Sequence, residues 1–166
     1  IIVEPGAEKQ VAIVCTVEKE WGSYDAFSIV KKEEDRINSL HSMQRFQGDN
    51  FASVLAVAAD KFIVHRQSTG KKTIIAGYPW FADWGRDTMI SLCGLTLVTG
   101  RYKDAEEILV TFSKYIKHGL VPNMFPEGND EPLYNSVDAS LWYFEAIGKY
   151  LRYTGNYDFI KDSLYA

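Results

Sequence analysis

The chain has 166 residues, of which 46% are hydrophobic and 24% charged, with a net charge of -4. This composition is typical of a soluble globular protein of about one domain. The acidic balance provides no basic stripe for nucleic acid, and no apolar run approaches the roughly 18 residues that a membrane span needs. The two cysteines, Cys15 and Cys93, lie far apart, form no disulfide framework or metal motif, and fit a reducing cytoplasm.

Alternating apolar residues mark the beginning of the chain. They recur at every second position from Val11 to Val17, after turn residues at Pro5 and Gly6, which predicts a β-hairpin. Because two strands are not stable alone, we interpret residues 1–24 as the end of an upstream β domain or a linker. The chain begins at Ile1 rather than Met, so we expect it to be part of a longer protein.

From about residue 25 onward the apolar periodicity is helical. Six helical segments are predicted, at about residues 30–46, 51–64, 86–98, 102–117 and 137–153 and from about 157 onward. Capping residues precede several segments and glycines follow them. The segments 86–98 and 137–153 are apolar nearly all round and are expected to be buried on every side, whereas 102–117 is amphipathic.

A weak internal repeat links two of the predicted helix ends. Residues 98–103 (Val-Thr-Gly-Arg-Tyr-Lys) resemble residues 153–158 (Tyr-Thr-Gly-Asn-Tyr-Asp), displaced by 55 positions. In both places a buried helix ends in Thr-Gly and another begins shortly afterwards. Repeated helical hairpins predict stacking around a common axis, either as an open solenoid or as a closed toroid. Inner helices that are apolar all round favour the toroid.

Two long loops, at residues 76–87 and 121–138, interrupt the helical pattern. Each leads into the N-terminus of a buried helix and places an acid there, Asp87 in the first loop and Asp138 in the second. Both loops are therefore expected at the same end of the helix stack. Aromatic rings, carboxylates and Arg86 would converge there, which is the composition of a carbohydrate pocket.

Each of these residues also has a purely structural explanation. Aspartate at a helix start is usually a cap or a partner of the helix dipole. Trp80, Trp84 and Trp142 could fill the core, as most tryptophans do. Glu127 and Glu131 lie in a polar loop, where carboxylates are usually solvated. The three histidines show neither metal-ligand spacing nor a nucleophile partner, so no metal site is predicted.

The loop motifs resemble a known family. They read Gly77-Tyr78-Pro79-Trp80-Phe81, Trp84-Gly85-Arg86-Asp87-Thr88, Val121-Pro122-Asn123 and Tyr134-Asn135-Ser136-Val137-Asp138-Ala139-Ser140-Leu141-Trp142. In combination they are similar to the amylo-α-1,6-glucosidase domain of glycogen debranching enzymes, most closely the bacterial and archaeal type, from about Asp25 onward. The resemblance implies a mainly α fold in which residues 25–166 are the N-terminal part of an (α/α)6 toroid, preceded by a β domain.

The resemblance also implies an activity. The family removes α-1,6-linked glucose stubs from glycogen or related α-glucans by inverting hydrolysis, without a cofactor, which requires a general acid and a general base about 6.5–9.5 Å apart. By motif, Asp138 is the acid, and the base is a Glu beyond Ala166. Arg86 and Asp87 match the pair that holds hydroxyls of the terminal glucose. Further substrate contacts are implied for Trp84, which closes that subsite, and for Trp80, Asn123 and Tyr134.

The acid role of Asp138 contains a physical conflict. A helix N-terminus lowers the pKa of a carboxyl group, whereas a general acid has to keep its proton near neutral pH. Burial against Trp142 and repulsion from the base would have to raise the pKa by more than the helix lowers it.

Other functions remain open on the sequence alone. The chain could belong to a glucoamylase- or trehalase-like toroid glucosidase, to a non-catalytic helical carbohydrate-binding module, or to a structural unit without its own activity. A toroid of six hairpins needs roughly twice the helical length present here. The chain by itself is therefore expected to be inactive.

Overall fold

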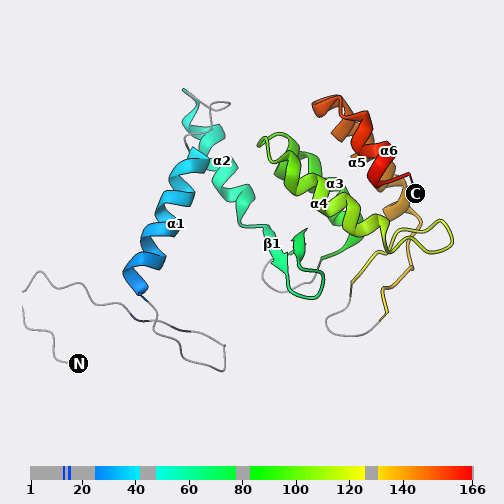
Figure 1. The fold of residues 1–166 in the computed structure, drawn as a ribbon, viewed down its shortest axis with the longest axis horizontal. Coiled ribbons are helices and arrows are strands. Elements are labelled where there is room, and N and C mark those ends of the chain that lie inside the picture. Colours follow the sequence, from blue (N-terminus) through cyan, green and yellow to red (C-terminus); the bar gives the residue numbers. More distant parts are fainter. Residues whose placement is uncertain are drawn as a thin grey trace, which may run out of the picture.

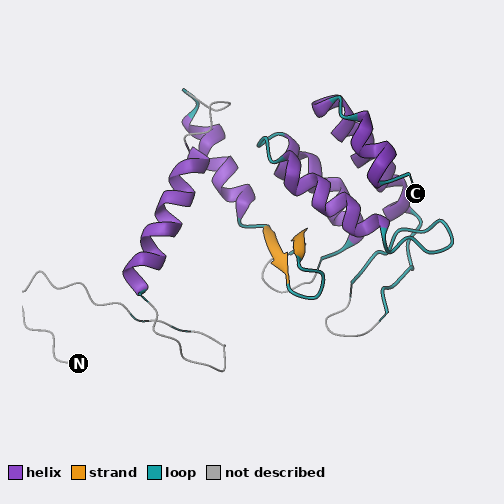
Figure 2. Ribbon diagram, in the orientation of Figure 1, coloured by secondary structure: helices purple, strands orange, loops and turns teal. Residues whose placement is uncertain are grey.

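The computed structural model describes residues 13, 15, 25–41, 48–77, 83–125 and 131–165 (Figure 1). The elements follow in the order α1 (Ala26–His41), α2 (Asn50–Asp60), β1 (Ile63–Arg66), β2 (Lys71–Ile74), α3 (Gly85–Leu92), the π-helix η2 (Cys93–Leu97), α4 (Tyr102–Ser113), α5 (Asp138–Thr154) and α6 (Tyr157–Ser163). Helices predominate over one two-stranded sheet in the described residues, which confirms the mainly α fold class (Figure 2). Helices α3 to α6 form one group, and α1 stands apart from it, joined through α2 (Figure 1).

The helix starts follow local capping. Helix α1 begins at Ala26, earlier than predicted, because the Asp25 carboxylate accepts the backbone N–H of Ser28 (3.2 Å). The side chains of Asp49 and Asn156 cap α2 and α6 in the same way. At the other end of α5, Gly155 adopts a left-handed conformation (φ 64°), and its N–H bonds to the carbonyl of Leu151. The predicted end of the first helix falls on residues 42–47, outside the described part of the chain.

The predicted helix at 51–64 is wrong at its C-terminal end. Helix α2 ends at Asp60, and Val64 lies in β1, which pairs with β2 in an antiparallel hairpin with Ile63 opposite Ile74. Gly70, at φ 62°, closes the turn of this hairpin. Ile74 is buried in the core with residues of α3 and α4, so tertiary contacts stabilise the strand. The hairpin predicted before residue 25 falls outside the described residues, apart from Ile13 and Cys15, which are not in strands.

Two further predicted helices differ at their C-terminal ends. The segment predicted at 86–98 becomes a π-helix from Cys93, where the N–H of Val98 bonds to the Cys93 carbonyl. The hydroxyl of Thr96 donates a hydrogen bond to the Leu92 carbonyl (2.6 Å). In a regular α-helix that carbonyl would accept from a backbone N–H alone. The segment predicted at 102–117 ends at Ser113, and the chain then forms a tight turn in which Lys117 pairs with Leu120.

The core lies between β2, α3, η2, α4 and α5. Its buried members are Ile74, Met89, Leu92, Leu97, Ala105, Ile108, Leu109, Phe112, Val121, Phe125, Tyr143, Ala146 and Tyr150. The loop residue Phe125 enters this core edge-on to the rings of Phe112 and Tyr115, with ring centroids 4.9 Å apart in both pairs. Packing of Phe125 therefore fixes the loop that follows Val121 to the helical body.

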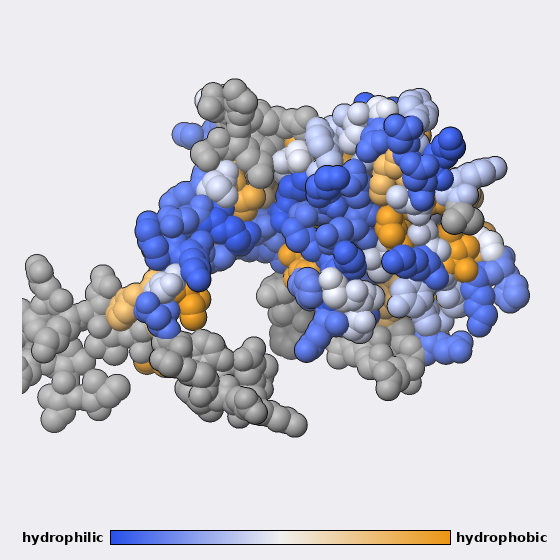
Figure 3. Space-filling view, viewed as in Figure 1, coloured by the Kyte–Doolittle hydropathy of each residue, from blue (hydrophilic) through white to orange (hydrophobic). Residues whose placement is uncertain are grey.

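The expectation that α3 and α5 are buried on every side is wrong for this chain. Leu141 and Phe144 on α5 are 65% and 73% exposed, and Ile90 on α3 is also exposed. Within the described residues, α5 packs against α3, η2 and α4, and these contacts leave another face of the helix in solvent. Phe27, Ile29 and Val30 form a second exposed apolar group at the start of α1, and the visible surface of the rest of this helix is mostly hydrophilic (Figure 3).

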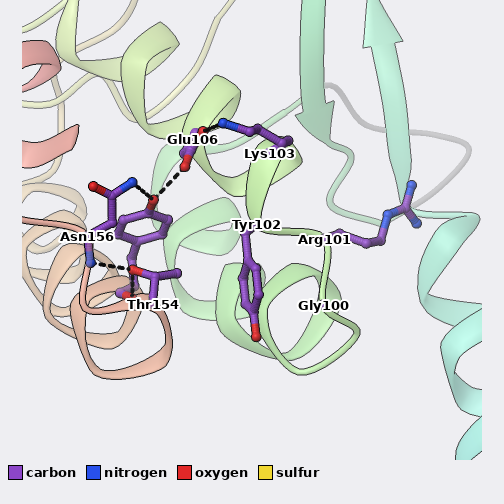
Figure 4. Close-up of a pocket in the computed structure, with 8 residues that line it drawn as sticks. Gly100, Arg101, Tyr102, Lys103, Glu106, Thr154 and Asn156 are labelled. Carbon is purple, nitrogen blue, oxygen red and sulfur yellow. Dashed lines mark hydrogen bonds and ion pairs between the residues drawn. The ribbon is translucent and has the colours of Figure 1, made fainter. Parts of the chain in front are cut away.

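The internal repeat brings its two Thr-Gly corners together. Gly100 and Thr154 line the same cavity, of about 370 Å³, at the end of α5 remote from Asp138 (Figure 4). Beside it the Tyr150 hydroxyl donates to Glu106 (2.5 Å), and burial together with this bond raises the pKa of Tyr150 to about 12. This arrangement is consistent with a partial helical toroid.

Among the described residues, no helix is both long and apolar enough to cross a membrane.

Candidate active site

Backbone pairing brings the two predicted loops together. Trp84 forms a bridge with Met124, which in turn forms a bridge with Leu133. The N–H of Gly85 donates to the carbonyl of Asn123 (2.8 Å). The expectation that both loops meet at one end of the helices is therefore confirmed for their described parts.

Gly85 permits this close approach. A Cβ atom at this position would lie 2.1 Å from the carbonyl oxygen of Pro122, well inside van der Waals contact. The residue needs no unusual backbone angle, so the requirement for glycine here is purely one of space. This close backbone contact thus joins the Trp84-Gly85-Arg86 motif to the Val121-Pro122-Asn123 motif.

A single guanidinium group faces the two candidate carboxylates. Arg86 Nε lies 3.9 Å from Asp87 Oδ2, and Arg86 Nη1 lies 3.7 Å from Asp138 Oδ2. The side chains of Arg86, Asp87 and Asp138 are 53%, 44% and 43% exposed, so a ligand can reach all three. Loose, exposed ion pairs of this kind add little stability. Both carboxylates thus pair with the same guanidinium group.

The surroundings of Asp138 favour its ionised form. Asp138 is the first residue of α5, and Ser136 donates its hydroxyl to Asp138 Oδ1. This hydrogen bond, the positive charge of Arg86 and the backbone N–H groups at the helix start lower the pKa of Asp138. Trp142 is partly buried and packs against the hydrophobic core, which agrees with its interpretation as a core residue. Partial desolvation opposes this effect, and the net result of the described residues is a lowered pKa of Asp138, which is the wrong direction for a general acid.

We expect Ser136→Ala to raise the pKa of Asp138 toward its ordinary value, because the substitution removes the strongest of these stabilising interactions. A folded-state pKa below the unfolded value of 3.8 adds stability above that value, and this stability is lost as the pH falls through the folded pKa. Acid destabilisation below about pH 4 should therefore be weaker in Ser136→Ala. A carboxyl ¹³C titration measures the pKa, with Ser39→Ala in α1 as the control. Equal Asp138 pKa values in both variants would contradict the expectation.

The other predicted substrate contacts differ in how they are placed. Trp84 is half-buried at the N-cap of α3. Asn123 donates its amide to Asn135 (3.1 Å), while its buried Oδ1 has no hydrogen-bond partner among the described residues. The Tyr134 hydroxyl donates to the backbone carbonyl of Tyr115 (2.6 Å), so it anchors the loop. Trp80 lies outside the described residues.

The remaining candidates contribute little to this site. Glu131 is exposed and lies 3.6 Å from Lys117, which agrees with a solvated carboxylate. Glu127 lies outside the described residues. In the described part of the chain, no group of three or more His, Cys, Asp or Glu side chains could hold a metal ion.

Two charged residues beside the site, one buried and one partly buried, were not singled out from the sequence. Asp83, directly before Trp84, pairs with Arg66 of β1. A polar residue inside the aromatic loop motif was the available signal for Asp83. Arg66 gave no signal, because no strand was predicted after the helix at 51–64.

The comparisons with known proteins identify the family. A family model described as amylo-alpha-1,6-glucosidase matches residues 57–166, which include both loops and both aspartates. The chain belongs to this family. It is 32% identical over 129 residues to the glycogen debranching enzyme of Saccharomyces cerevisiae, an alignment covering 70% of this chain and 8% of the yeast enzyme. The chain thus spans less than a tenth of that relative. The family resemblance is confirmed, and the bacterial and archaeal type stays a prediction.

Proposed function

We propose that this chain contributes one wall of the active site of a glycoside hydrolase that removes α-1,6-linked glucose from glycogen or a related α-glucan. Membership of the amylo-alpha-1,6-glucosidase family supports this function. The observation that carries it is the solvent-open group in which Arg86 faces both Asp87 and Asp138. Carboxylates and a guanidinium beside a tryptophan are suited to the hydroxyls and the apolar face of a glucose unit.

The proposed reaction is hydrolysis with inversion. Asp138 gives its proton to the glycosidic oxygen as the bond from this oxygen to the anomeric carbon breaks. A general base, which we place in a Glu beyond Ala166, removes a proton from water as the water attacks that carbon from the opposite face. Arg86 and Asp87 hold hydroxyls of the terminal glucose that is attacked, and Trp84 lies against its ring. No cofactor takes part in these steps.

The proposed acid role requires a change in the pKa of Asp138. In the open site Ser136 and Arg86 lower it. A bound glucose unit that excludes water, and a second carboxylate from the base, would both disfavour the anion and raise the pKa. The proton donor is then formed only in the assembled, occupied site.

The proposal extends to the domain organisation, the substrate and the cellular compartment. Residues 25–166 form the first part of an (α/α)6 toroid, and residues 1–24 end a preceding β domain or form a linker. The partner is an α-glucan in the cytoplasm, with no role for nucleic acid or membrane.

Glucose release tests the function. The full-length protein should release glucose from dextrins with single α-1,6-linked stubs, and ¹H NMR should show the β anomer first, as inversion requires. The 166-residue chain alone should release none above background, because it lacks the proposed base. Preference for maltose or trehalose would instead indicate a glucoamylase- or trehalase-like enzyme, and glucan binding without release a carbohydrate-binding module. Turnover by the 166 residues would place the base within them, with Glu127 and Glu131 the first to test.

A further inference from the structure

A largely buried ion pair joins Asp83, the residue before Trp84, to Arg66 of β1. Asp83 is 2% exposed, and its carboxylate accepts hydrogen bonds from Arg66 Nε (3.1 Å), from Arg66 Nη2 and from the Thr73 hydroxyl (2.8 Å). Burying such a pair costs desolvation energy that its attraction barely offsets, so a buried ion pair is weak support for stability. Its hydrogen bonds are, however, directional and hold their partners in one geometry.

Arg66 also reaches the second loop of the site. Its Nη2 donates to the backbone carbonyl of Phe125 (3.2 Å), and its guanidinium carbon lies 5.1 Å from the centre of the Phe125 ring. One side chain from β1 therefore ties the residue before Trp84 to the end of the segment 121–125. These two attachment points are separated by about forty residues in the chain.

Between these attachments the two loop segments are in direct contact. The N–H of Gly85 donates to Asn123, and Trp84 bridges Met124. Arg86 and Asp87 follow directly in the first turn of α3, and Arg86 also pairs with Asp138. A shift of Asp83 or Phe125 would thus be transmitted to the side chains that are to hold glucose, and a misplacement of 1 Å in such a site can reduce the rate about 10²-fold.

We propose that Arg66 and Asp83 are a positioning pair for the glucose subsite. The inference rests on the proposed function. The pair does not touch the substrate. It sets the register of the segment 84–87 against 121–125 and thereby places Arg86 and Asp87. Lysine cannot replace Arg66, because one ammonium group cannot make the paired bonds to Asp83 and also reach the Phe125 carbonyl.

The chain contains a matched control for this pair. Arg101 is 14% exposed against 13% for Arg66, and it binds the buried carboxylates of Asp60 and Asp104. It lies at the start of α4, next to the cavity at the other end of α5, and points away from that cavity toward α2 (Figure 4). Arg101→Lys thus disturbs a comparable arginine with two carboxylate partners that, in the described part of the chain, makes no hydrogen bond or ion pair with the segments 84–87 and 121–125, although its partner Asp104 also binds Lys72 of β2.

The test compares Arg66→Lys with Arg101→Lys in the full-length protein, at a temperature where both are folded. We expect Arg66→Lys to reduce kcat/KM for glucose release about 10²-fold, with a rise in KM because ground-state contacts are misplaced. Arg101→Lys should keep the wild-type kcat/KM. Equal loss in both variants, or no loss in Arg66→Lys, would overturn the positioning role.

A milder pair of variants covers the case in which the arginine variants do not fold. Thr73→Val removes one hydrogen bond to Asp83, and Thr99→Val removes a hydroxyl of equal burial that bonds only within its own helical segment. Thr73→Val should lower kcat/KM about tenfold, the lower end of what a hydrogen bond to a charged group contributes. Thr99→Val should not. A larger loss in Thr99→Val, or an equal loss in both variants, would overturn the positioning role of Arg66 and Asp83.

Hydrogen exchange separates this inference from the proposed function. Peptides that cover residues 84–87 should exchange faster in Arg66→Lys, or in Thr73→Val, than in the matched control variant, whether or not the protein releases glucose. A wild-type protein without glucose release would refute the proposed function alone. Equal exchange in variant and control would refute the positioning of this segment by Arg66 and Asp83.

Discussion

Asp138→Asn in the full-length protein is expected to lower kcat by about 10²–10⁴-fold and to leave KM nearly unchanged. The amide keeps the size and much of the polarity of the side chain but cannot give a proton to the glycosidic oxygen. Proton donation acts in the transition state, so the loss should fall on kcat. Steady-state glucose release from a branched dextrin measures both constants.

Asp87→Asn serves as the matched variant, because both carboxylates face Arg86. Asp87 is proposed to hold hydroxyls in the ground state, so its substitution should raise KM together with any loss in kcat. An α-glucosyl fluoride, whose leaving group needs little protonation, should restore much of the rate of Asp138→Asn and little of that of Asp87→Asn. Equal rescue of both variants, or of neither, would mean that Asp138 is not the acid.

Gly85→Ala is expected to cause the largest loss of stability among these substitutions. The new Cβ would meet the Pro122 carbonyl oxygen at 2.1 Å, and a backbone atom held by its neighbours cannot move aside without breaking the bond from Gly85 to Asn123. Overpacking of this kind costs about 1–3 kcal/mol, and a clash with backbone should lie at the upper end, near 3 kcal/mol. Chemical denaturation of the variant and the wild type measures the change.

Gly148→Ala provides the control. Gly148 lies within α5, and a Cβ there would meet no atom within 4 Å apart from the nearby backbone of its own helix. Alanine favours a helix over glycine by up to about 1 kcal/mol, so this substitution should stabilise the protein. If Gly85→Ala were as stable as the wild type, segments 84–87 and 121–125 would not be in the close contact described here.

Much of the helical framework follows from local sequence. Asp49 and Asn156 cap the helices that they precede, and Gly155 ends α5 in the left-handed conformation that glycine adopts easily. The Thr-Gly repeat places Gly100 and Thr154 at one cavity. These features depend on neighbours within a few residues or on hydrophobic periodicity, which a sequence displays directly.

The sequence also indicates the family and the two loops that approach each other. Trp84 to Asp87 and Val121 to Asn123 form motifs whose combination is specific, and the family match confirms the resemblance. The catalytic and binding roles of Arg86, Asp87 and Asp138 stay predictions, because neither the fold nor the family match assigns a role to a single residue.

Tertiary structure alone decided the features that depend on distant contacts. Val64 lies in a strand rather than a helix because the hairpin inserts Ile74 into the core. The exposure of Leu141 and Phe144 depends on which helices pack against α5, and their apolar character alone predicted burial. Arg66 and Asp83 meet across 17 positions, and Arg66 reaches Phe125 across 59. Local periodicity carries no information about such pairs, because their energy depends on burial and geometry that arise only when the chain has folded.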